Sequence, residues 1–326
     1  MARMRVLSGT RPTDRLHLGN LLGALENWKK IQSEHESFFM IADWHALTTE
    51  YERSKSIRST VREVAADYIG AGLDPERSVI FVQSHVPAHA ELHLLLSMIV
   101  PIPWLTRNPT YKEQLKELKD RDLGTYGFLG YPVLQAADIL VYRAGLVPVG
   151  QDQLPHLELA REIARRFNFL YGTFFPEPEH RLTEAPRVGG LDGRKMSKSY
   201  NNCIYLADDE KAVKQKVASM VTDPQRKLRT DPGRPEVCNV FTFHKIVNRD
   251  QVETVHRECT TAARGCVECK AEMAARLNQY MDPIRERRAA VMSRKGRIEE
   301  ILAGGDQKAQ AVANETLAGA KDKVGL

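Results

Sequence analysis

Two segments of the chain contain residues that could bind a phosphate group. The first, His17-Leu18-Gly19-Asn20, follows a short apolar strand and opens a helix, so backbone N–H groups and the positive end of a helix dipole could face an anion. His17 and Asn20 can donate hydrogen bonds to phosphate oxygens, and Gly19 would let a flat ring such as adenine approach the backbone. An ordinary βα unit with a surface histidine fits this segment equally well.

The second segment is the loop from Gly189 to Ser199, which reads GGLDGRKMSKS. Its three glycines describe a mobile loop. Lys195 and Lys198 could bring two ammonium groups onto a triphosphate and neutralise the charge that develops as pyrophosphate leaves. A basic surface loop is the alternative. The first strand is followed by neither a G-x-G-x-x-G motif nor a Walker P-loop, so a rarer type of nucleotide site is required.

A third group of residues could bind a planar ring. Tyr131, Gln135 and Asp138 are spaced four and three residues apart, so they share a face of a helix that continues beyond Pro132. Apolar residues flank Asp138, and its carboxylate must therefore find a hydrogen-bond donor in a neighbouring loop or in a ligand. The shared face favours a pocket for a ring with one N–H or O–H group.

Four of the five cysteines lie close together in the sequence: Cys238, Cys259, Cys266 and Cys269. We expect a cytoplasmic protein, because the N-terminus has no apolar leader and the longest apolar stretch is too short to span a membrane. In that compartment the spacing favours a metal site over disulfides. Four thiolates fit structural zinc or an iron–sulfur cluster, and free buried cysteines are the alternative.

Alternating strands and helices must position these residues. Apolar runs predict strands near Val6 and at 37–42, 78–83 and 146–149, and helical spacing predicts helices at 53–70, 89–100, 127–143 and 155–167. This order predicts an α/β fold with a doubly wound, Rossmann-like parallel sheet. Asp43-Trp44-His45 and Gly150-Gln151-Asp152-Gln153 follow two of the strands, where such folds bind ligands; for Asp152 the alternative is a helix cap.

Residues 111–122 are predicted to form a solvated helix. After Asp208 the pattern predicts helices alone, at 208–220, 270–281 and 282–304. We therefore expect a catalytic domain at 1–200, with a C-terminal helix packing back on it, and an α-helical domain with the cysteines at 201–326. The net charge of +5 permits a polyanionic partner without requiring one.

HLGN at 17–20 and KMSKS at 195–199 together make the chain resemble a class I aminoacyl-tRNA synthetase. The segments SGTRPT, ADWHALT, GYPVLQAADIL and VPVGQDQ and the cysteine set are similar to those of bacterial-type tryptophanyl-tRNA synthetases, along essentially the whole chain. The resemblance implies that L-tryptophan reacts with ATP and Mg²⁺ to give tryptophanyl-adenylate and pyrophosphate, and that tryptophan then passes to the 3′ end of tRNA(Trp). Positioning and charge stabilisation should carry the rate, because no residue need act as a nucleophile.

The resemblance also implies roles for matching residues. Lys195, Lys198 and His17 would be the catalytic residues. ATP would contact Arg11, Pro12, Thr13, Gly19, Asn20, Gly150, Gln151, Asp152, Val188, Lys195, Met196, Ser197, Lys198 and Ser199. Asp138 would accept the indole N–H of tryptophan, in a site lined by Tyr131, Gln135, Gln153, His45 and Leu7.

A subset of this family carries a [4Fe-4S] cluster on a similar cysteine set. The resemblance therefore favours that cluster on Cys238, Cys259, Cys266 and Cys269, with zinc as the second choice, although the subset usually has a slightly longer first interval. It further implies a homodimer without membrane association. The helical domain would read the anticodon, and its basic residues Arg285, Arg287, Arg288, Arg294, Lys295 and Arg297 would contact phosphates or form a solvated face.

Two departures from the family pattern keep another function open. Asp14 replaces the family's usual glycine close to the phosphate site, where a carboxylate is unfavourable, and Gln151 replaces the usual glutamate. These changes are compatible with a weakly charging paralogue that acts as a tryptophan sensor or partner-binding protein. A separate feature favours tryptophan over tyrosine as the substrate. Archaeal-type tyrosyl synthetases have a tyrosine where this chain has Leu7, and an apolar wall suits indole better than phenol.

Overall fold

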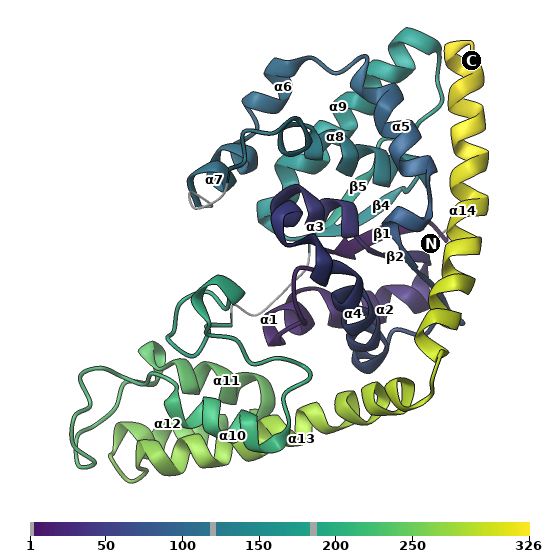
Figure 1. Cartoon of the computed structure of the whole chain (residues 1–326). Helices are drawn as coiled ribbons and strands as arrows, with labels where there is room; N and C mark the ends of the chain where they lie inside the picture. The colour runs from purple at the N-terminus through teal and green to yellow at the C-terminus, as the bar shows by residue number, and fades with distance from the viewer. Residues whose placement is uncertain (1–2, 118–121, 183–187) are drawn as a thin grey trace. The chain divides into compact units, whose positions relative to one another are not determined.

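The computed structural model describes residues 3–117, 122–182 and 188–326 (Figure 1). Its residues form two compact units. Unit 1 comprises residues 1–13, 23–184 and 291–326, and unit 2 comprises residues 14–22 and 185–290. This division differs from the expected boundary at residue 200, because residues 14–22 and 185–200 group with the helical segment and residues 291–326 group with the sheet.

Unit 1 is built on a parallel sheet of five strands in the order β3-β2-β1-β4-β5. The strands are β1 (Arg5–Thr10), β2 (Glu36–Ile41), β3 (Ser78–Val82), β4 (Leu146–Val149) and β5 (Glu179–Leu182). The predicted doubly wound sheet is confirmed, and four of its strands lie where the apolar runs predicted them. Strand β5 was not predicted, because all four of its residues are exposed and carry no apolar pattern.

Both faces of β2 are buried, and alternate residues pack on opposite sides of the sheet. Phe39 stacks on Trp28 of α2 (Glu26–Glu34), with ring centroids 4.9 Å apart. On the other face, Phe38 stacks on Tyr142 at 4.8 Å and packs with Met40 in the largest core cluster. The helices α5 (Ala88–Ser97), α8 (Tyr126–Val141) and α9 (Leu154–Tyr171) contribute side chains to that cluster.

The C-terminal helix α14 (Arg297–Val324) covers the β3 edge of the sheet and runs beside α5 (Figure 1). A Cβ atom on Gly305 would lie only 1.8 Å from the carbonyl oxygen of Ile80, so the helix reaches the strand only because residue 305 is glycine. Next to it, Asp306 accepts a hydrogen bond of 2.9 Å from the backbone N–H of Val82. The helix thereby satisfies a donor on an edge strand.

The remaining helices of unit 1 connect the strands. They are α3 (Asp43–Glu50), α4 (Ile57–Ala71), α6 (Ile102–Thr106) and α7 (Pro109–Glu117). The helix expected at 111–122 corresponds to α7, and residues 118–121 lie outside the described residues. Within the described residues, no helix is long and apolar enough to cross a bilayer.

Unit 2 contains α10 (Glu210–Ser219), α11 (Asn239–Val247), α12 (Val252–Thr260) and most of α13 (Cys266–Ser293), which lie together in Figure 1. The helix boundary expected between Met281 and Asp282 is wrong. Helix α13 continues through Pro283, and the chain breaks at Arg294–Gly296, where Gly296 has a φ of 80°. This left-handed conformation is one that glycine adopts without strain.

Candidate active site

The first part of the site lies at the carboxyl edge of the sheet in unit 1. Strand β1 pairs with β2 on one side and β4 on the other, so the connections after β1 and β4 diverge at the sheet's switch point, where open α/β folds bind ligands. Arg11, Pro12 and Thr13 follow β1, and the turn Gln151–Gln153 follows β4. A Cβ atom on Gly150 would lie 2.7 Å from Oδ1 of Asp152, so the turn requires glycine there.

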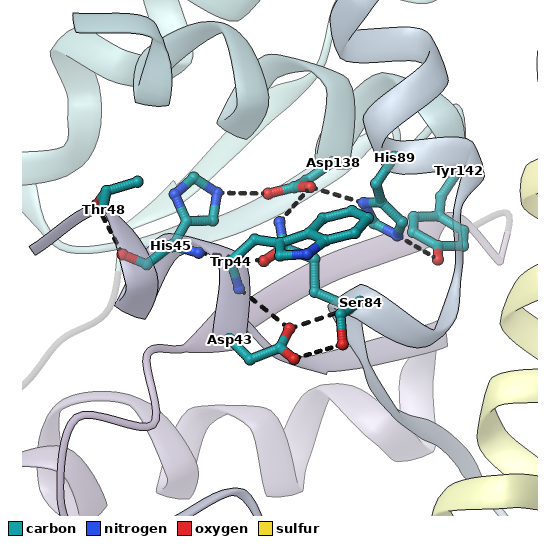
Figure 2. A network of polar contacts seen from close by, with 9 residues as sticks. Asp43, Trp44, His45, Thr48, Ser84, His89, Asp138 and Tyr142 are labelled. Carbon is teal, nitrogen blue, oxygen red and sulfur yellow. Dashed lines mark hydrogen bonds and ion pairs between the residues drawn. The ribbon is translucent and has the colours of Figure 1, made fainter. Parts of the chain in front are cut away.

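The centre of the predicted ring pocket is Asp138, which is 1% exposed (Figure 2). Its Oδ2 lies 2.7 Å from Nε2 of His45, and its Oδ1 lies 2.6 Å from Nδ1 of His89. Gln83 donates to Oδ1 at 2.8 Å. Burial raises the pKa of Asp138, but the charge and hydrogen bond of His45, together with His89, outweigh burial and hold the pKa well below its usual value. The carboxylate is therefore ionised at neutral pH.

Three donors occupy three of the roughly four acceptor positions of this carboxylate. Among the described residues, Oδ1 accepts twice and Oδ2 accepts once. One position on Oδ2 can thus accept a further hydrogen bond. The binding of a ligand N–H or O–H group at this position stays a prediction, and Gln83 and His89 are partners of Asp138 that sequence reasoning missed.

The loops after β2 and β3 fix the orientation of His45 (Figure 2). Asp43 accepts hydrogen bonds from Ser84 Oγ at 2.5 Å and from the backbone N–H of Ser84 at 3.0 Å. The backbone N–H of His45 donates to Oε1 of Gln83 at 3.4 Å, so the amide of Gln83 bridges His45 and Asp138. A polar residue directly after the apolar strand SVIFV was the signal that could have indicated Gln83.

A second network holds Tyr131 of α8. Its hydroxyl lies 2.9 Å from Nε2 of His156, whose Nδ1 lies 3.3 Å from Oε1 of Gln153. The amide oxygen of Gln153 only accepts, so Nδ1 carries the proton and Nε2 accepts from Tyr131. Burial first, then the charges of His45 and Arg11, lower the pKa of His156 to about 4 against the raising effect of Asp152, so the ring is neutral.

The remaining predicted tryptophan-site residues are also in unit 1. Gln135 is half-buried on α8, on the face shared by Tyr131 and Asp138, and Leu7 of β1 is buried in the largest core cluster. His156 was missed, because the sequence PHLEL after the turn reads as an ordinary helix start. The described geometry therefore joins Asp138 to His45 directly, and it joins Tyr131 to Gln153 through His156, which the sequence did not indicate.

Two other segments with predicted site residues, His17–Asn20 and the KMSKS segment, belong to unit 2. The backbone N–H of Leu18 donates to the carbonyl of Ile204 at 2.9 Å, and that of Leu206 donates to Leu16 at 2.9 Å. Backbone hydrogen bonds thus join the HLGN segment to residues 204–206, which follow the KMSKS motif in the sequence. Helix α1 (Leu18–Asn20) continues through a π-helical turn at Leu21–Leu25, and Asn20 accepts from the backbone N–H of His17 at 3.0 Å.

His17 is buried, and its Nδ1 has no hydrogen-bond partner among the described residues. A Cβ atom on Gly19 would lie 2.9 Å from this imidazole ring, so His17 itself requires a glycine at that position. Burial first, and the charge of Lys198 second, lower the pKa of His17 to about 4, although Asp14 acts in the opposite direction. A neutral imidazole therefore lies near a lysine of the KMSKS segment.

Two asparagines that sequence reasoning missed hold the KMSKS loop. Asn202 is 2% exposed, accepts from the backbone N–H of Ser197 at 2.8 Å, and donates to Asp192 and to the carbonyl of Lys195 at 2.7 and 3.2 Å. Asn239 donates to the carbonyl of Gly190 at 2.7 Å. Their backbone contacts set the course of the loop. The signal for Asn202 was its position directly after the motif.

Other predicted ATP-site residues differ in burial, and the nearby Asp14 has hydrogen-bond partners. Met196 is buried, Val188 is half-buried, and the side chain of Ser199 lies outside the described part of the structure. Asp14 accepts a hydrogen bond from the hydroxyl of Tyr205 at 3.2 Å and from the backbone N–H of Arg15 at 2.7 Å. The carboxylate that departs from the family pattern therefore has partners within unit 2.

The four clustered cysteines come together in unit 2. Cys238 is the N-cap of α11, Cys259 lies on α12, and Cys266 begins α13, one turn before Cys269. Burial raises the pKa of the Cys269 thiol to about 12, and the charges of the other three cysteines contribute in the same direction. The thiols are thus close enough to influence one another.

Burial raises the pKa of Cys238 and of Cys259, and neighbouring groups oppose this effect only in part. Backbone N–H groups of Phe241 and Val240 donate to Cys238 and lower its pKa against the larger raising effect of burial. A Cβ atom on Gly233 would lie 2.5 Å from Sγ of Cys259, so residue 233 leaves room for the sulfur. Within the described residues, however, no three His, Cys, Asp or Glu side chains are grouped closely enough to hold a single metal ion.

Arg285, one of the basic residues predicted to contact phosphates or solvent, forms hydrogen bonds within unit 2. Its guanidinium donates to the carbonyl of Asp208 at 2.9 Å, to Asp282 at 2.8 Å and to Asn278 at 2.6 Å. These contacts fix α13 to the start of α10, and they give Arg285 a structural role. Arg297 lies on α14, where it pairs with Glu300 at 2.9 Å.

Comparison with known proteins agrees with this geometry. Residues 1–282 match the family model described as tRNA synthetases class I (W and Y). The chain is 50% identical to a tryptophan–tRNA ligase of Thermotoga maritima, covering 96% of this chain and 97% of that protein, and 44% identical to one of Aquifex aeolicus, covering 96% and 98%. A crystal structure of tryptophanyl-tRNA synthetase from Campylobacter jejuni, complexed with ADP and tryptophan, superposes with a TM-score of 0.90 at 34% identity, covering 99% of this chain and 100% of that one. The chain therefore belongs to the class I tRNA synthetases of the tryptophan and tyrosine family.

Proposed function

We propose that this synthetase is a tryptophan–tRNA ligase: it activates L-tryptophan with ATP and transfers it to the 3′ end of tRNA(Trp). The observation that carries the proposal is the 50% identity, over nearly the full length of both chains, to a ligase of that specificity. The buried, ionised Asp138 with one acceptor position left supports it, because indole presents a single N–H group.

On the amino-acid side, Asp138 accepts the indole N–H, and His45, His89 and Gln83 hold the carboxylate in place. Tyr131, Gln135 and Gln153 line the site, with Leu7 as the apolar wall. A site built around a buried acceptor strongly rejects an analogue that cannot supply the donor in the same place. This is how we expect tryptophan to be distinguished from phenylalanine.

On the nucleotide side, Arg11, Pro12 and Thr13 after β1 and Gly150, Gln151 and Asp152 after β4 contact ATP. His17, Gly19 and Asn20 bind the phosphates, and Lys195 and Lys198 neutralise the charge that develops as the tryptophan carboxylate attacks the α-phosphorus and pyrophosphate leaves. The α-phosphorus–oxygen bond to pyrophosphate breaks as the mixed anhydride forms. A ribose hydroxyl of tRNA then takes the acyl group, and AMP leaves.

Trp-dependent ATP–pyrophosphate exchange, followed by charging of tRNA(Trp), tests this function. We expect both reactions with tryptophan and neither with tyrosine. A weakly charging paralogue that only senses tryptophan would bind the amino acid and show neither reaction, and exchange with tyrosine alone would overturn the assignment.

We further propose that the protein works as a homodimer. Leu94, Met98 and Ile102 are 54%, 73% and 64% exposed on neighbouring turns of α5 and α6, and an apolar surface of this kind marks an interaction site. Static light scattering should give the mass of two chains. Met98→Glu should shift that mass towards one chain while the melting temperature is retained.

We also propose that Cys238, Cys259, Cys266 and Cys269 hold a [4Fe-4S] cluster. A four-iron cube holds its thiolates farther apart than a single tetrahedral zinc ion, which needs sulfurs about 3.8 Å from one another. What supports the proposal is the donor set: four thiols in one unit that raise one another's pKa values. When bound, the cluster would supply positive metal charge to half-buried thiolates. Iron and sulfide analysis of anaerobically purified protein tests this proposal, and protein that contains zinc alone would contradict it.

A further inference from the structure

A histidine lies against one of the four cysteines without belonging to their set. His244 of α11 is fully buried, and its Nε2 lies 3.3 Å from Sγ of Cys269. The same nitrogen lies 3.3 Å from the carbonyl oxygen of Cys269, which is inside α13 and accepts a helical hydrogen bond as well. A deprotonated sulfur is the charged acceptor of the two and attracts the ring N–H more strongly.

Which nitrogen of His244 carries the proton is decided by its neighbours. Nδ2 of Asn248 lies 2.8 Å from Oε1 of Glu272 and 3.0 Å from Nδ1 of His244. A carboxylate only accepts hydrogen bonds, so Asn248 must turn its NH₂ group towards Glu272. The second hydrogen of that group then points at Nδ1 of His244, which accepts it. The ring proton is left on Nε2, facing Cys269.

The carboxylate of Glu272, from which this series of hydrogen bonds starts, is itself held in place. Glu272 forms an ion pair with Arg264, whose guanidinium also donates to Glu258 at 2.8 Å. Arg264 is 9% exposed, whereas the side chain of Glu272 is 31% exposed, so the pair is shielded from solvent on the arginine side. The amide of Asn248 is fully buried, and its Oδ1 has no partner among the described residues, so no competing donor favours turning the amide over.

We propose that His244 donates its Nε2–H to the Cys269 thiolate when that sulfur holds the cluster, and that Asn248 and Glu272 set the tautomer that makes this possible. The inference rests on the four-cysteine cluster proposed above. A hydrogen bond to a ligating sulfur withdraws electron density from it and favours the reduced, more negative cluster. His244 is thus a positioning residue that raises the reduction potential of the cluster.

The test is a redox titration of the anaerobically purified full-length protein, followed by electron paramagnetic resonance, with iron counted per chain. His244→Met keeps an uncharged side chain of similar length but removes the donor, and we expect it to retain iron with a lower midpoint potential. His244→Gln restores an N–H donor and should return the potential towards that of the wild type. His256→Gln is the matched control: this histidine of the same unit pairs with Glu236 at 3.0 Å and should leave the potential unchanged.

A second variant guards against a folding defect at the buried ring. Glu272→Gln leaves His244 in place but allows the amide of Asn248 to turn over, which moves the ring proton to Nδ1; the potential should again fall with iron retained. Unchanged potentials in iron-loaded His244→Met and Glu272→Gln proteins would overturn the inference and leave the cluster proposal standing. Wild-type protein without iron would overturn both.

Discussion

Asp138 of unit 1 is buried and the four cysteines of unit 2 are half-buried, and at Asp138, Cys238, Cys259 and Cys269 removal from water raises the pKa. They differ in what opposes it. Histidines and an amide donate to Asp138 and hold its pKa well below the usual value, so the carboxylate is ionised with protein partners alone. At Cys269 the nearby cysteines add to the effect of burial, and the pKa rises to about 12.

The difference separates a preformed site from one that requires a bound group. The donors around Asp138 are in place before a ligand arrives, so binding tryptophan costs little reorganisation. Half-buried thiols with raised pKa values become thiolates when a positive charge compensates them, so binding of the proposed cluster would couple to the stability of the fold. The following predictions test that contrast, from the largest expected effect to the smallest.

Removing one of the proposed cluster ligands should have the largest effect. If the proposal holds, Cys259→Ser loses its iron and unit 2 loses several kcal/mol of stability, because metal binding contributes to folding. Cys203→Ser is the control, since Cys203 stands apart from the four in the sequence. Iron content and the melting temperature are the measurements. Full iron in Cys259→Ser would remove this residue from the ligand set.

Removing the charge of Asp138 should come next. Asp138→Asn keeps the shape but replaces charged hydrogen bonds, and we expect kcat/KM for tryptophan in the exchange reaction to fall about 100-fold, or about 3 kcal/mol. Asp138→Ala also leaves two histidines without their partner and should lower the free energy of unfolding by about 3 to 5 kcal/mol. A change in KM for ATP of the same size would argue against an amino-acid role.

The protein should become less stable as the pH is lowered from 6.5 to about 4. His156 has a folded-state pKa of about 4, below its ordinary value of 6.5, so the unfolded chain binds the proton first as pH falls. The stabilisation is complete above pH 6.5 and is lost between about 6.5 and 4, by up to ~3 kcal/mol. Urea unfolding across this range measures it.

His17 of unit 2 has the same pKa and adds a similar dependence. His156→Gln should therefore remove only part of the slope, and His156→Gln with His17→Gln most of it. If the single variant retained the full slope, the buried neutral state of His156 would be wrong.

Loosening the KMSKS loop should have the smallest effect on stability and a selective effect on rate. Asn202→Ala removes three hydrogen bonds, and we expect a loss of about 2 kcal/mol of stability in unit 2 and a lower kcat of exchange. The KM for tryptophan should be unchanged, because Asn202 contacts only the loop. Asn201→Gly is the control at the exposed neighbour, since Asn201 has a φ of 49° that glycine adopts without strain. Equal kcat values for the two variants would show that the loop does not depend on Asn202.

The sequence alone determined the strands β1 to β4, the helix faces and the motifs. Apolar periodicity is local: a run such as SFFMIA specifies a buried strand whatever lies beside it, and Tyr131, Gln135 and Asp138 share a face because of helical spacing alone. The exposed strand β5 was not predicted, because its pairing with β4 outweighs a weak local signal. The full length of α13 was not predicted either, because packing in unit 2 outweighs the local signal at Pro283.

Only the tertiary structure decided which side chains complete each site. Gln83 and His89 reach Asp138 from segments 55 and 49 residues away, and Asn248 acts on His244 through a carboxylate on another helix. Hydrogen-bond donors have no periodicity that would reveal their acceptors, because a bond depends on distance and angle in the folded chain. The residue types therefore predicted the chemistry, while the fold alone assigned the partners that determine charge and tautomer.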